Sequence, residues 1–428
     1  MNRSELIAHL DADYRRPIRD PLWKHIYLSD PLLRIIDTKP CRQLSRIKQL
    51  GPAFLVYPGA THTRLNHSFG VFHLAKRIVR VLLGFSDLPS LSIEGVKAFL
   101  CASLLHDVGH FPYAHSFKEL PLEEHEALTG HLVQEGELSR RIREELKVDP
   151  YLVAAIVDDT LDTRGNAEIH FFRRILSGAL DPDKLDYLNR DAYFCGVPYG
   201  VQDIDFALSR IVPDSAQGLA IDATGVSAIE SLLFSKYLMY RAVYWHRTVR
   251  VATAMIKKAV YLGLTQGEIT ADQLYGLDDE QFFTRFTGEK AAPFRLVERV
   301  YNRDLYRPIL DLPFSEDHPF GDVGDLAQRE ALEGALAAAI AKDTGISCGS
   351  DAVILDVPEA ISFEVNLPVV SGEGTLDYPE SATVFTPQVV KDFTRTLRRV
   401  RLIVRPDLAD HVTHPEAILL STSRAISR

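Results

Sequence analysis

Hydrophobic residues recur at helical spacing through most of the first two thirds of the chain. From about residue 30 to about residue 262, the pattern of apolar and polar positions is that of amphipathic α-helices. The longest stretch predicts a single helix from Val226 to about Leu262, with Lys236, Tyr240 and Tyr244 among its apolar turns. Most of this region is therefore expected to be helical.

The pattern changes later in the chain. Segments 352–357, 360–370, 381–386 and 399–406 are rich in β-branched residues, are bounded by Gly, Pro and Asp, and predict strands. Residues 265–290 are mostly polar and are interrupted by glycines, which favours a boundary between two lobes of the chain in this segment. We therefore predict a mainly α fold, with a helical core over residues 1–265 and a smaller C-terminal α+β lobe over residues 266–428.

His106 and Asp107 form a doublet at the end of the apolar run 96–105. Gly109 and Pro112 follow closely and predict that the helix stops at the doublet. Neighbouring helical side chains diverge by about 100°, so both can turn toward one point only at a helix end or a kink. An imidazole and a carboxylate aimed at one point suit a divalent metal with nitrogen and oxygen ligands. Such doublets are common by chance, but eight of the fifteen histidines lie between residues 62 and 131, which strengthens the metal hypothesis.

Two further candidate ligands lie on either side of the doublet in sequence. His67 falls on the first turn of a predicted helix that Asn66 can cap, and a ligand there is held rigidly. Asp183 falls on the first turn of another predicted helix, with Asp181 as N-cap and Gly196 as its C-terminal stop.

The helix that starts at Asp181 carries Asp183, Tyr187 and Asp191 on one face, at i, i+4 and i+8. A purely structural role is open for Asp183 and Asp186, because carboxylates in a first turn favour the helix dipole. That role does not explain a tyrosine and a second carboxylate on the same stripe, so the pattern favours a site.

The order His67, His106–Asp107, Asp183 resembles the H…HD…D pattern of the HD-domain metal-dependent phosphohydrolases. A narrower resemblance, to the deoxynucleoside triphosphate triphosphohydrolases (dNTPases) of this superfamily, rests on five ordered blocks: residues 20–38, 46–71, 104–117, 181–197 and 239–250. It implies an HD-domain helical core with one divalent metal ion per active site, held by these four residues. Such ligands accept Mn, Fe, Ni, Zn, Co or Mg, and Mg can also accompany the nucleotide.

The resemblance also implies catalytic roles for three histidines. His110, His115 and His125 match family histidines beside the scissile bond, where an imidazole can protonate the leaving oxygen or orient water. The mammalian member has an aspartate three residues beyond the position of His115, where this chain has Lys118. Glu119 is a candidate substitute.

Cations for the phosphates are implied at three matching positions: Arg64, Lys184 and Lys236. Lys236 stands where the mammalian member has arginine, so the charge is kept and the bidentate fork is lost. The ordinary alternative for each of them is a solvated surface charge.

The sugar site is implied by five more matching positions. Gln49 and Asp191 match the pair that binds a 3′-hydroxyl, and Leu50, Tyr187 and Tyr244 match the wall against the sugar. A wall at C2′ leaves no room for a 2′-hydroxyl, which implies rejection of ribonucleotides. A tyrosine in a helix is otherwise usually part of the core.

Members of this family commonly form tetramers that nucleotides activate, so residues 1–45 are expected at an oligomer or effector interface. Of the family residues that read an activating guanine, Asp37 is kept, but Arg42 replaces a glutamine and Ser45 an arginine. Ser45 is too short to replace a forked donor. We expect a homo-oligomer, tetramer or dimer, with weak or absent activation by GTP, unless Arg42 or Arg46 restores the contact.

Composition narrows the possible partners. The formal net charge of −10 disfavours nonspecific binding to nucleic acid. No window approaches twenty apolar residues, and the four cysteines form no CxxC pair, so we expect a cytoplasmic protein with neither membrane span nor zinc ribbon.

These observations lead to one main hypothesis: metal-dependent hydrolysis of dNTPs to deoxynucleoside and inorganic triphosphate. The alternatives are another HD-type phosphohydrolase, such as a 5′-nucleotidase or phosphodiesterase, and a non-catalytic nucleotide sensor. The sugar-site blocks argue against the first alternative. The complete set of four candidate ligands argues against the second.

Overall fold

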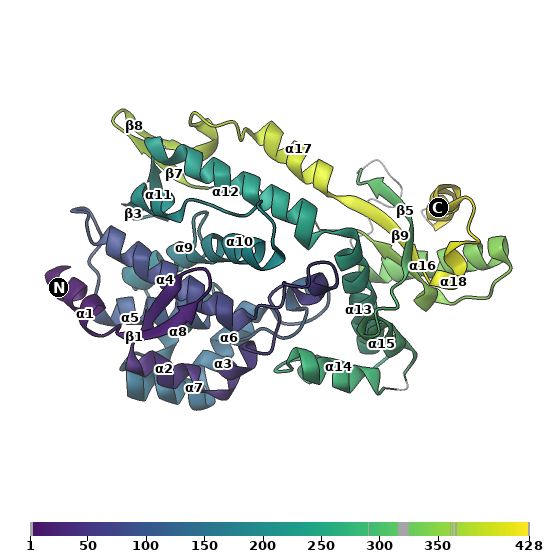
Figure 1. Cartoon of the computed structure of the whole chain (residues 1–428), viewed down its shortest axis with the longest axis horizontal. Coiled ribbons are helices and arrows are strands. Elements are labelled where there is room, and N and C mark those ends of the chain that lie inside the picture. The colour runs from purple at the N-terminus through teal and green to yellow at the C-terminus, as the bar shows by residue number, and fades with distance from the viewer. Residues whose placement is uncertain are drawn as a thin grey trace.

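The computed structural model describes residues 3–289, 291–315, 325–359, 361, 363 and 366–426, and most of this part is helical (Figure 1). The helices of the first 265 residues are α1 (Arg3–Ala12), α2 (Asp30–Ile36), α3 (Lys39–Leu44), α4 (Arg64–Leu82), α5 (Ile93–Leu105), α6 (His125–Gln134), α7 (Gly136–Arg141), α8 (Pro150–Val157), α9 (Ala167–Leu176), α10 (Pro182–Cys195), α11 (Ile204–Ser209), α12 (Val226–Met239) and α13 (Arg247–Thr265). Later helices are α14 (Asp279–Thr287), α15 (Arg295–Tyr301), α16 (Leu326–Thr344), α17 (Pro387–Leu397), α18 (Pro406–Ala409) and α19 (Pro415–Ile426). The predicted mainly α fold is confirmed.

The largest core lies between the helices that carry the candidate site. Helix α4 packs against both α5 and α10, and α8 and α9 cover α5. Val71, Ala75, Ile78 and Leu82, which recur at helical spacing along α4, are all fully buried. A rigid, dry core of this kind fixes the side chains that project from its helix ends.

Short strands form three small sheets. A hairpin joins β1 (Arg16–Asp20) to β2 (Lys24–Leu28), and a second sheet has the order β3 (Ile211–Asp214), β4 (Gly218–Asp222), β7 (Pro368–Ser371), β8 (Gly374–Asp377). The third sheet has the order β5 (Arg307–Pro313), β9 (Arg399–Val404), β6 (Val353–Asp356), all antiparallel. The hairpins at 16–28 and 211–222 were not predicted.

The expected strands beyond residue 350 have mixed outcomes. Segments 352–357 and 399–406 contain β6 and β9, as predicted. Part of segment 360–370 lies outside the described residues, and its end forms β7. The prediction of a strand at 381–386 is wrong. Glu230 of α12 accepts hydrogen bonds from the Thr383 hydroxyl and the Val384 amide, and Thr386 caps α17, so these groups do not pair in a sheet.

The predicted single helix from Val226 to Leu262 is also wrong, because it breaks at Trp245–His246. A π-helical turn from Tyr240 to Tyr244 ends α12, and α13 starts again at Arg247. The His246 ring accepts from the Thr248 amide and caps the new helix. The break lets α13 leave the core and run to the C-terminal lobe (Figure 1).

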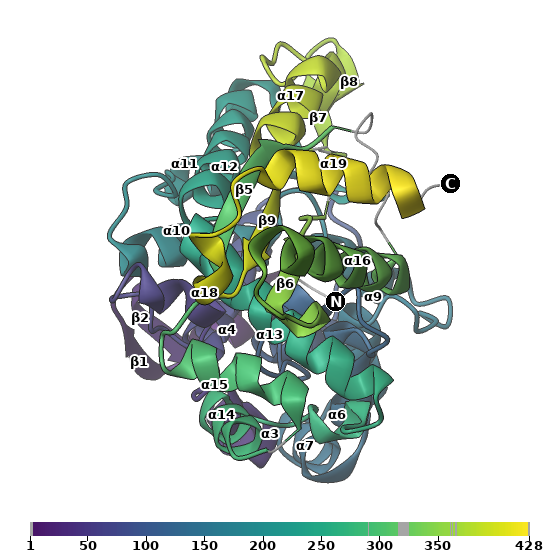
Figure 2. The same ribbon diagram turned by 90° about the vertical axis from the view of Figure 1, so that its right-hand side faces the viewer.

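Residues 326–356 and 399–426 form most of a smaller α+β lobe, where α16 packs on α19 and on β6 beside the third sheet (Figure 2). The chain does not stay there, since β7 pairs with β4 and places residues 368–371 on the helical part. The division of the chain near residue 265 stays a prediction.

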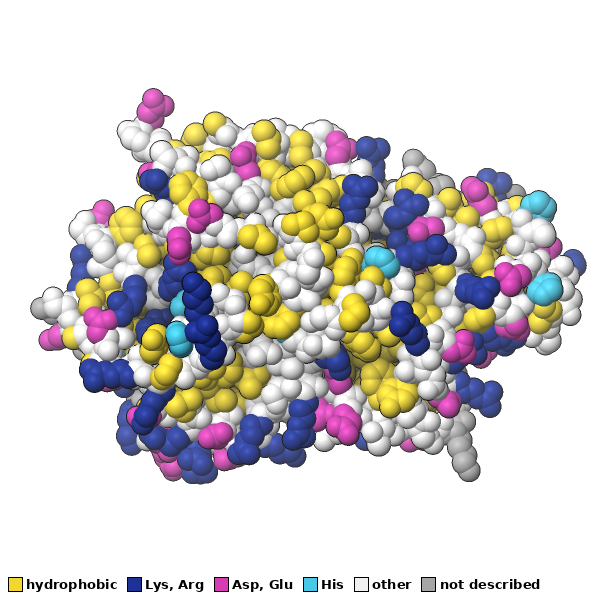
Figure 3. Space-filling model, in the orientation of Figure 1, with side chains coloured by type: hydrophobic (Ala, Val, Ile, Leu, Met, Phe, Trp, Pro, Cys, Tyr) yellow, Lys and Arg dark blue, Asp and Glu magenta, His cyan; other side chains and the backbone are white. Residues whose placement is uncertain are grey.

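The face drawn in Figure 3 mixes basic and acidic side chains, and several hydrophobic patches lie among them, one of them in the upper part, where α12 and α17 lie in Figure 1. Within the described ranges, we find no helix whose length and apolar character would let it cross a bilayer.

Candidate active site

Helix α4 presents His67 from its first turn, as predicted, but its cap is Thr63 and not Asn66. The Thr63 hydroxyl accepts from the Asn66 amide, and the Asn66 side chain accepts from the Thr63 amide, which forms a capping box. Asn66 lies inside the first turn because its side chain reaches back to the cap. The box holds the first turn, and with it His67, in place.

Helix α5 ends at Leu105 and the doublet follows, as predicted. Thr129 of α6 locks this turn, since its hydroxyl donates to the His106 carbonyl and accepts from the Gly109 amide. A Cβ atom at Gly109 would lie 2.4 Å from the His125 carbonyl oxygen and 2.5 Å from the Thr129 nitrogen. Glycine at 109 therefore allows α6 to press against the doublet.

Helix α10 has the predicted ends. Asp181 accepts from the Lys184 amide at the N-terminus, and Gly196 closes the C-terminus with a φ of 68°. Asp183 extends from the first turn toward His67, and its side chain is 38% exposed. Solvent therefore reaches the otherwise buried centre at this partly exposed carboxylate.

The four predicted ligands converge. The Asp183 Oδ1 atom lies 2.8 Å from His67 Nε2 and 4.0 Å from His106 Nε2, which is itself 3.4 Å from Asp107 Oδ1. Nitrogen and oxygen atoms at such separations can share one cation with bonds of about 2.0–2.2 Å.

The partners of the two imidazole Nδ1 atoms fit a metal at the Nε2 atoms. His67 directs Nδ1 to Asp186 and His106 directs Nδ1 to the Ser103 carbonyl, so each can hold its Nε2 lone pair toward the centre. The buried Nε2 of His106 finds no hydrogen-bond partner in the described part of the chain. An unpaired buried nitrogen costs free energy, which a cation would offset.

A buried network lies behind His67. Asp186 accepts from His67 at 2.9 Å, from Trp23 and from two nitrogens of Arg190, which also bonds Asp20 at 2.8 Å. Gly70 leaves room for it, because a Cβ there would lie 1.8 Å from Asp186 Oδ1. The network fixes the ring of His67.

Asp107 has a second partner on its other side. Its Oδ2 atom accepts from Arg64 Nη1 at 2.8 Å, and both side chains are buried. Burial would raise the pKa of Asp107, but His106, His110 and Arg64 hold it well below the usual value. Asp107 is therefore a carboxylate, the form that binds a cation.

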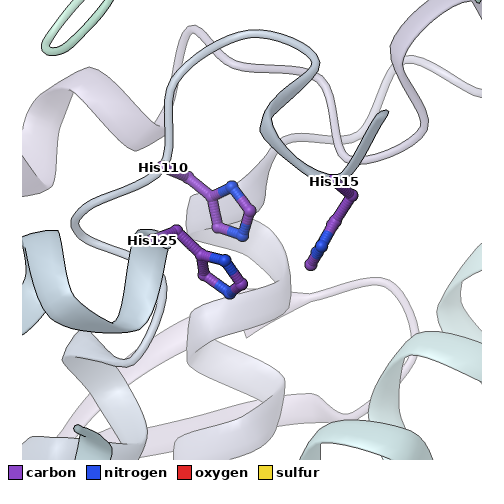
Figure 4. Close-up of side chains that lie close together, drawn as sticks. All are labelled: His110, His115 and His125. Atoms are coloured by element: carbon purple, nitrogen blue, oxygen red, sulfur yellow. The ribbon is translucent and has the colours of Figure 1, made fainter. Parts of the chain in front are cut away.

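His110, His115 and His125 form a second cluster beside Asp107 (Figure 4). The rings of His110 and His125 stack with centroids 3.9 Å apart, and the ring of His115, from the far end of the same loop as His110, lies 4.6 Å from His110 and 4.8 Å from His125. Burial, followed by nearby positive charge that includes Arg64, holds the pKa of the buried His110 and His125 well below the usual value. Their nitrogens lie close enough to hold an ion, but the Arg64 charge favours an anion there.

Two of these histidines have a carboxylate close by, and neither carboxylate is Glu119. His110 Nε2 lies 3.2 Å from Asp107, and His125 Nδ1 lies 3.0 Å from Glu126. The suggestion that Glu119 steers His115 is wrong, because Glu119 pairs with Lys257 at 2.6 Å and with Arg329 at 3.0 Å. These two cations come from α13 and α16, so Glu119 instead ties the His115 segment to the C-terminal lobe.

Replacement of Glu119 by alanine should lower the free energy of unfolding by about 1–3 kcal/mol, since it leaves a largely buried Lys257 without its carboxylate. Urea titration of both proteins measures this. Glu144→Ala, which breaks an exposed pair with Arg140, is the control and should change stability by less than about 0.5 kcal/mol. Equal stability of Glu119→Ala and the wild type would contradict a bracing role.

Four of the predicted sugar residues, Gln49, Tyr187, Asp191 and Tyr244, are linked through direct contacts and through His62. Asp191 accepts from His62 at 2.8 Å and from the Tyr244 hydroxyl at 2.7 Å, and the rings of Tyr187 and Tyr244 are 6.4 Å apart. The backbone N–H of Gln49 donates to the His62 carbonyl. The side-chain Oε1 of Gln49 is buried and has no hydrogen-bond partner among the described residues. Leu50 packs on the core nearby.

The predicted phosphate cations lie at different distances from the ligands. Arg64 bonds Asp107 directly, while Lys184 turns to Asp181 and the Gly178 carbonyl. Lys236 lies over the Phe363 ring at 5.3 Å, and burial, with the charge of Lys184, lowers its pKa to about 8.

The possible effector residues lie on the surface. Arg42 donates Nε to the backbone carbonyl of Asp37 at 2.6 Å, and both side chains are exposed. The Ser45 hydroxyl donates back to the Arg42 carbonyl.

Some residues of the site had not been recognised from the sequence. The sequence pattern suggests only a helix-dipole role for Asp186. It suggests no role for Asp20, Arg190 or Trp23. The i, i+4 spacing of Asp186 and Arg190 was a readable signal, but their link to Asp20 joins distant segments and has no local pattern.

Comparisons with known proteins agree with this geometry. The sequence profile described as "HD domain" matches residues 64–182, and the one described as "HD associated region" matches residues 208–386. Uncharacterized protein MJ1154 of Methanocaldococcus jannaschii is 33% identical over 71% of this chain, which spans 61% of that protein. Human deoxynucleoside triphosphate triphosphohydrolase SAMHD1 is 27% identical over 72% of this chain and 52% of its own length.

Solved structures share the fold. A hypothetical protein from Aquifex aeolicus matches with a TM-score of 0.69 at 24% identity, over 96% of this chain and 99% of its own. A phosphohydrolase from Bacteroides thetaiotaomicron matches with a TM-score of 0.68 at 22% identity, over 91% and 99%. With the HD domain, the associated region and the dNTPase relatives together, the chain belongs to the HD-domain, dNTPase-like family of phosphohydrolases.

Proposed function

We propose that the protein hydrolyses dNTPs to deoxynucleoside and inorganic triphosphate at the centre formed by His67, His106, Asp107 and Asp183. The observation that carries the proposal is the convergence of these four groups next to a cluster of three histidines, with Tyr187 and Asp191 on the same helix as Asp183. Its curated relatives include proteins named deoxynucleoside triphosphate triphosphohydrolase.

The residues divide the chemistry between them. A divalent ion at this centre would polarise a phosphoryl group for attack. Arg64 presents positive charge between the ligands and the histidines, where charge develops on the phosphate oxygens. His110, His115 and His125 face the same space, and a neutral imidazole there can hold or pass the proton of the attacking water.

The predicted sugar residues support a deoxynucleotide substrate. Asp191 is held in place by His62 and Tyr244, and Gln49 offers a buried oxygen with no hydrogen-bond partner in the described part of the chain. A 3′-hydroxyl that donates to this oxygen would satisfy it. The rings of Tyr187 and Tyr244 lie 6.4 Å apart, and a sugar packed against them at C2′ would have no room for a 2′-hydroxyl.

Initial rates with the four dNTPs and the four ribonucleoside triphosphates, with and without Mn²⁺, test the proposal. We expect turnover of one or more dNTPs that depends on the metal, and rates at least about a hundredfold lower for ribonucleotides, as a steric mismatch of several kcal/mol gives. Cleavage of nucleoside monophosphates or cyclic dinucleotides without cleavage of dNTPs would instead support the 5′-nucleotidase or phosphodiesterase alternative.

We expect the protein to form a homo-oligomer. We expect its activation by GTP to be weak or absent. Arg42 is already bonded to the Asp37 backbone, and Ser45 cannot reach a guanine edge as an arginine does. Each unmatched polar edge costs on the order of 1–3 kcal/mol of binding. A titration of GTP into a dATP or dCTP assay measures this. Saturable activation at micromolar GTP that is lost in Asp37→Ala would contradict the expectation.

A further inference from the structure

Helix α14 touches two segments of the candidate active site that are far from it in sequence. It packs on α15, below α13 in Figure 1. Its first turn lies against residues 46–48, which lead directly into Gln49. Its apolar face lies against Tyr113, two residues before His115. One short helix therefore borders both the segment with a predicted sugar residue and the segment with a predicted catalytic histidine.

Asp279 makes the first of these contacts. Its Oδ2 atom accepts from the backbone N–H and from the ammonium group of Lys48, both at 3.1 Å. The backbone N–H of Asp279 donates to the Arg46 carbonyl at 3.3 Å. The Asp279 side chain is 15% exposed, so this ion pair is better shielded from water than a surface pair. The start of α14 thus supplies hydrogen bonds to one edge of residues 46–48.

The opposite edge of the same segment pairs with the residues that lead into α4. Gln49 donates its backbone N–H to the His62 carbonyl at 3.0 Å, and the Arg64 N–H donates to the Ile47 carbonyl at 2.9 Å. Residues 46–49 are therefore held on both edges. The buried Oε1 of Gln49 has no hydrogen-bond partner among the described residues, so the direction of this side chain depends on how its backbone is held.

The second contact holds an uncommon backbone conformation in place. Tyr113 has a φ of 65°, in the left-handed region that a bulky residue rarely adopts. Such a conformation costs free energy and persists where the surroundings fix it. The Tyr113 ring lies 5.6 Å from that of Phe282 in α14, and a Cβ atom at Gly51 would lie 3.4 Å from it. The 3₁₀ turn that carries His115 starts directly after Tyr113, so Phe282 helps to fix the start of that turn.

Ordinary core packing is the alternative role for α14, and the helix contains residues that show it. Phe282 and Phe286 are both fully buried, but Phe286 stacks on Phe294, with ring centroids 4.9 Å apart. Glu280 follows Asp279 in the first turn, and its side chain is exposed. Each residue that touches a site segment therefore has a neighbour of like chemistry in the same helix.

We propose that α14 positions both segments for the reaction. Asp279 sets the backbone from which Gln49 projects, and Phe282, through Tyr113, sets the turn that carries His115. Both act through other residues, so they are positioning residues. The roles of Gln49 and His115 rest on the proposed function, whereas the bracing of their segments by α14 does not.

Steady-state kinetics with a dNTP separate the two positioning roles. Asp279→Ala should raise KM about tenfold with kcat nearly unchanged, since a displaced Gln49 weakens binding in the ground state and the transition state alike. Asp279→Asn keeps an acceptor for the Lys48 N–H and should recover most of that loss. Phe282→Leu should lower kcat about tenfold with little change in KM, because His115 acts in the chemical step.

The neighbouring residues provide the matched controls. Glu280→Gln should leave both kinetic constants unchanged. Phe286→Leu should destabilise the protein as much as Phe282→Leu does, because both rings are fully buried, and should leave kcat and KM unchanged. The same loss of kcat in Phe282→Leu and Phe286→Leu, with an unchanged KM in Asp279→Ala, would indicate general destabilisation and overturn the proposal.

Hydrogen–deuterium exchange tests the bracing without any turnover. The Gln49 and Arg64 N–H groups, whose own hydrogen bonds do not involve α14, should exchange at least about fivefold faster in Asp279→Ala. The Ser116 N–H of the 3₁₀ turn should do so in Phe282→Leu, and each variant should leave the other segment unchanged. If exchange responded in this way but the wild type turned over no dNTP, the proposed function would fail and the bracing would stand. Unchanged exchange of these groups would overturn the bracing, whatever the activity.

Discussion

Replacement of Asp107 by alanine should abolish turnover and remove the bound divalent metal. Asp107 lies between the two clusters, with Oδ1 near both His106 and His110 and Oδ2 bonded to Arg64. The variant would lose a ligand and leave the buried Arg64 guanidinium unpaired. Loss of the several kcal/mol that metal polarisation supplies lowers the rate by at least about a thousandfold.

The measurement is metal content by mass spectrometry together with initial rates. His115→Ala serves as the matched control, since His115 belongs to the neighbouring cluster and not to the four ligands. It should keep the metal and lose about 10²–10⁴-fold in rate. An Asp107→Ala protein with near wild-type metal content and rate would place the site elsewhere.

Replacement of Asp186 by alanine should destabilise the whole helical core. Asp186 is fully buried and joins His67, Trp23 and Arg190. Without it, Asp20 is the one charged partner left to the buried Arg190 among the described residues. Removing one partner of a buried ion pair typically costs about 3–5 kcal/mol. His67 would also lose the group that orients it, so we expect metal affinity to fall about 10–100-fold.

Denaturant unfolding compares Asp186→Ala with the wild type. Asp205→Ala, which breaks an exposed pair with Arg77, should change stability by at most about 1 kcal/mol. A loss below that of Asp205→Ala would show that the network does not support the core.

The same network predicts a direction for the effect of pH. Burial raises the pKa of Asp186, but Arg190 and His67 lower it below the usual range. A depressed pKa stabilises the fold above the unfolded carboxyl's value of about 3.9, and this contribution is lost as pH falls below it toward the folded value. Acid unfolding of Asp186→Asn should accordingly begin from a lower stability and depend less on pH in this range.

The sequence could predict what is local. The ends of α5 and α10 follow from Gly109 and from Asp181 and Gly196, and the ligand positions follow from those ends. Helical periodicity also identified the apolar face of α4. Each of these signals lies within one or two turns of the residue that it places.

Contacts between distant segments could not be predicted in the same way. Glu119 pairs with cations more than a hundred residues away, and Glu230 takes up the groups that would have paired in a strand at 381–386. The break at Trp245–His246 depends on a π-turn inside a continuous apolar pattern. Hydrophobic periodicity carries no information about such partners.

The identity of the product shows whether the protein cleaves a dNTP between the deoxynucleoside and its triphosphate. Anion-exchange chromatography or ³¹P NMR of the products from a dNTP that is turned over separates the possible cleavage points. We expect inorganic triphosphate and deoxynucleoside in equal amounts, formed only with metal and absent in Asp107→Ala. Deoxynucleoside monophosphate with pyrophosphate, or release of single phosphates, would contradict it.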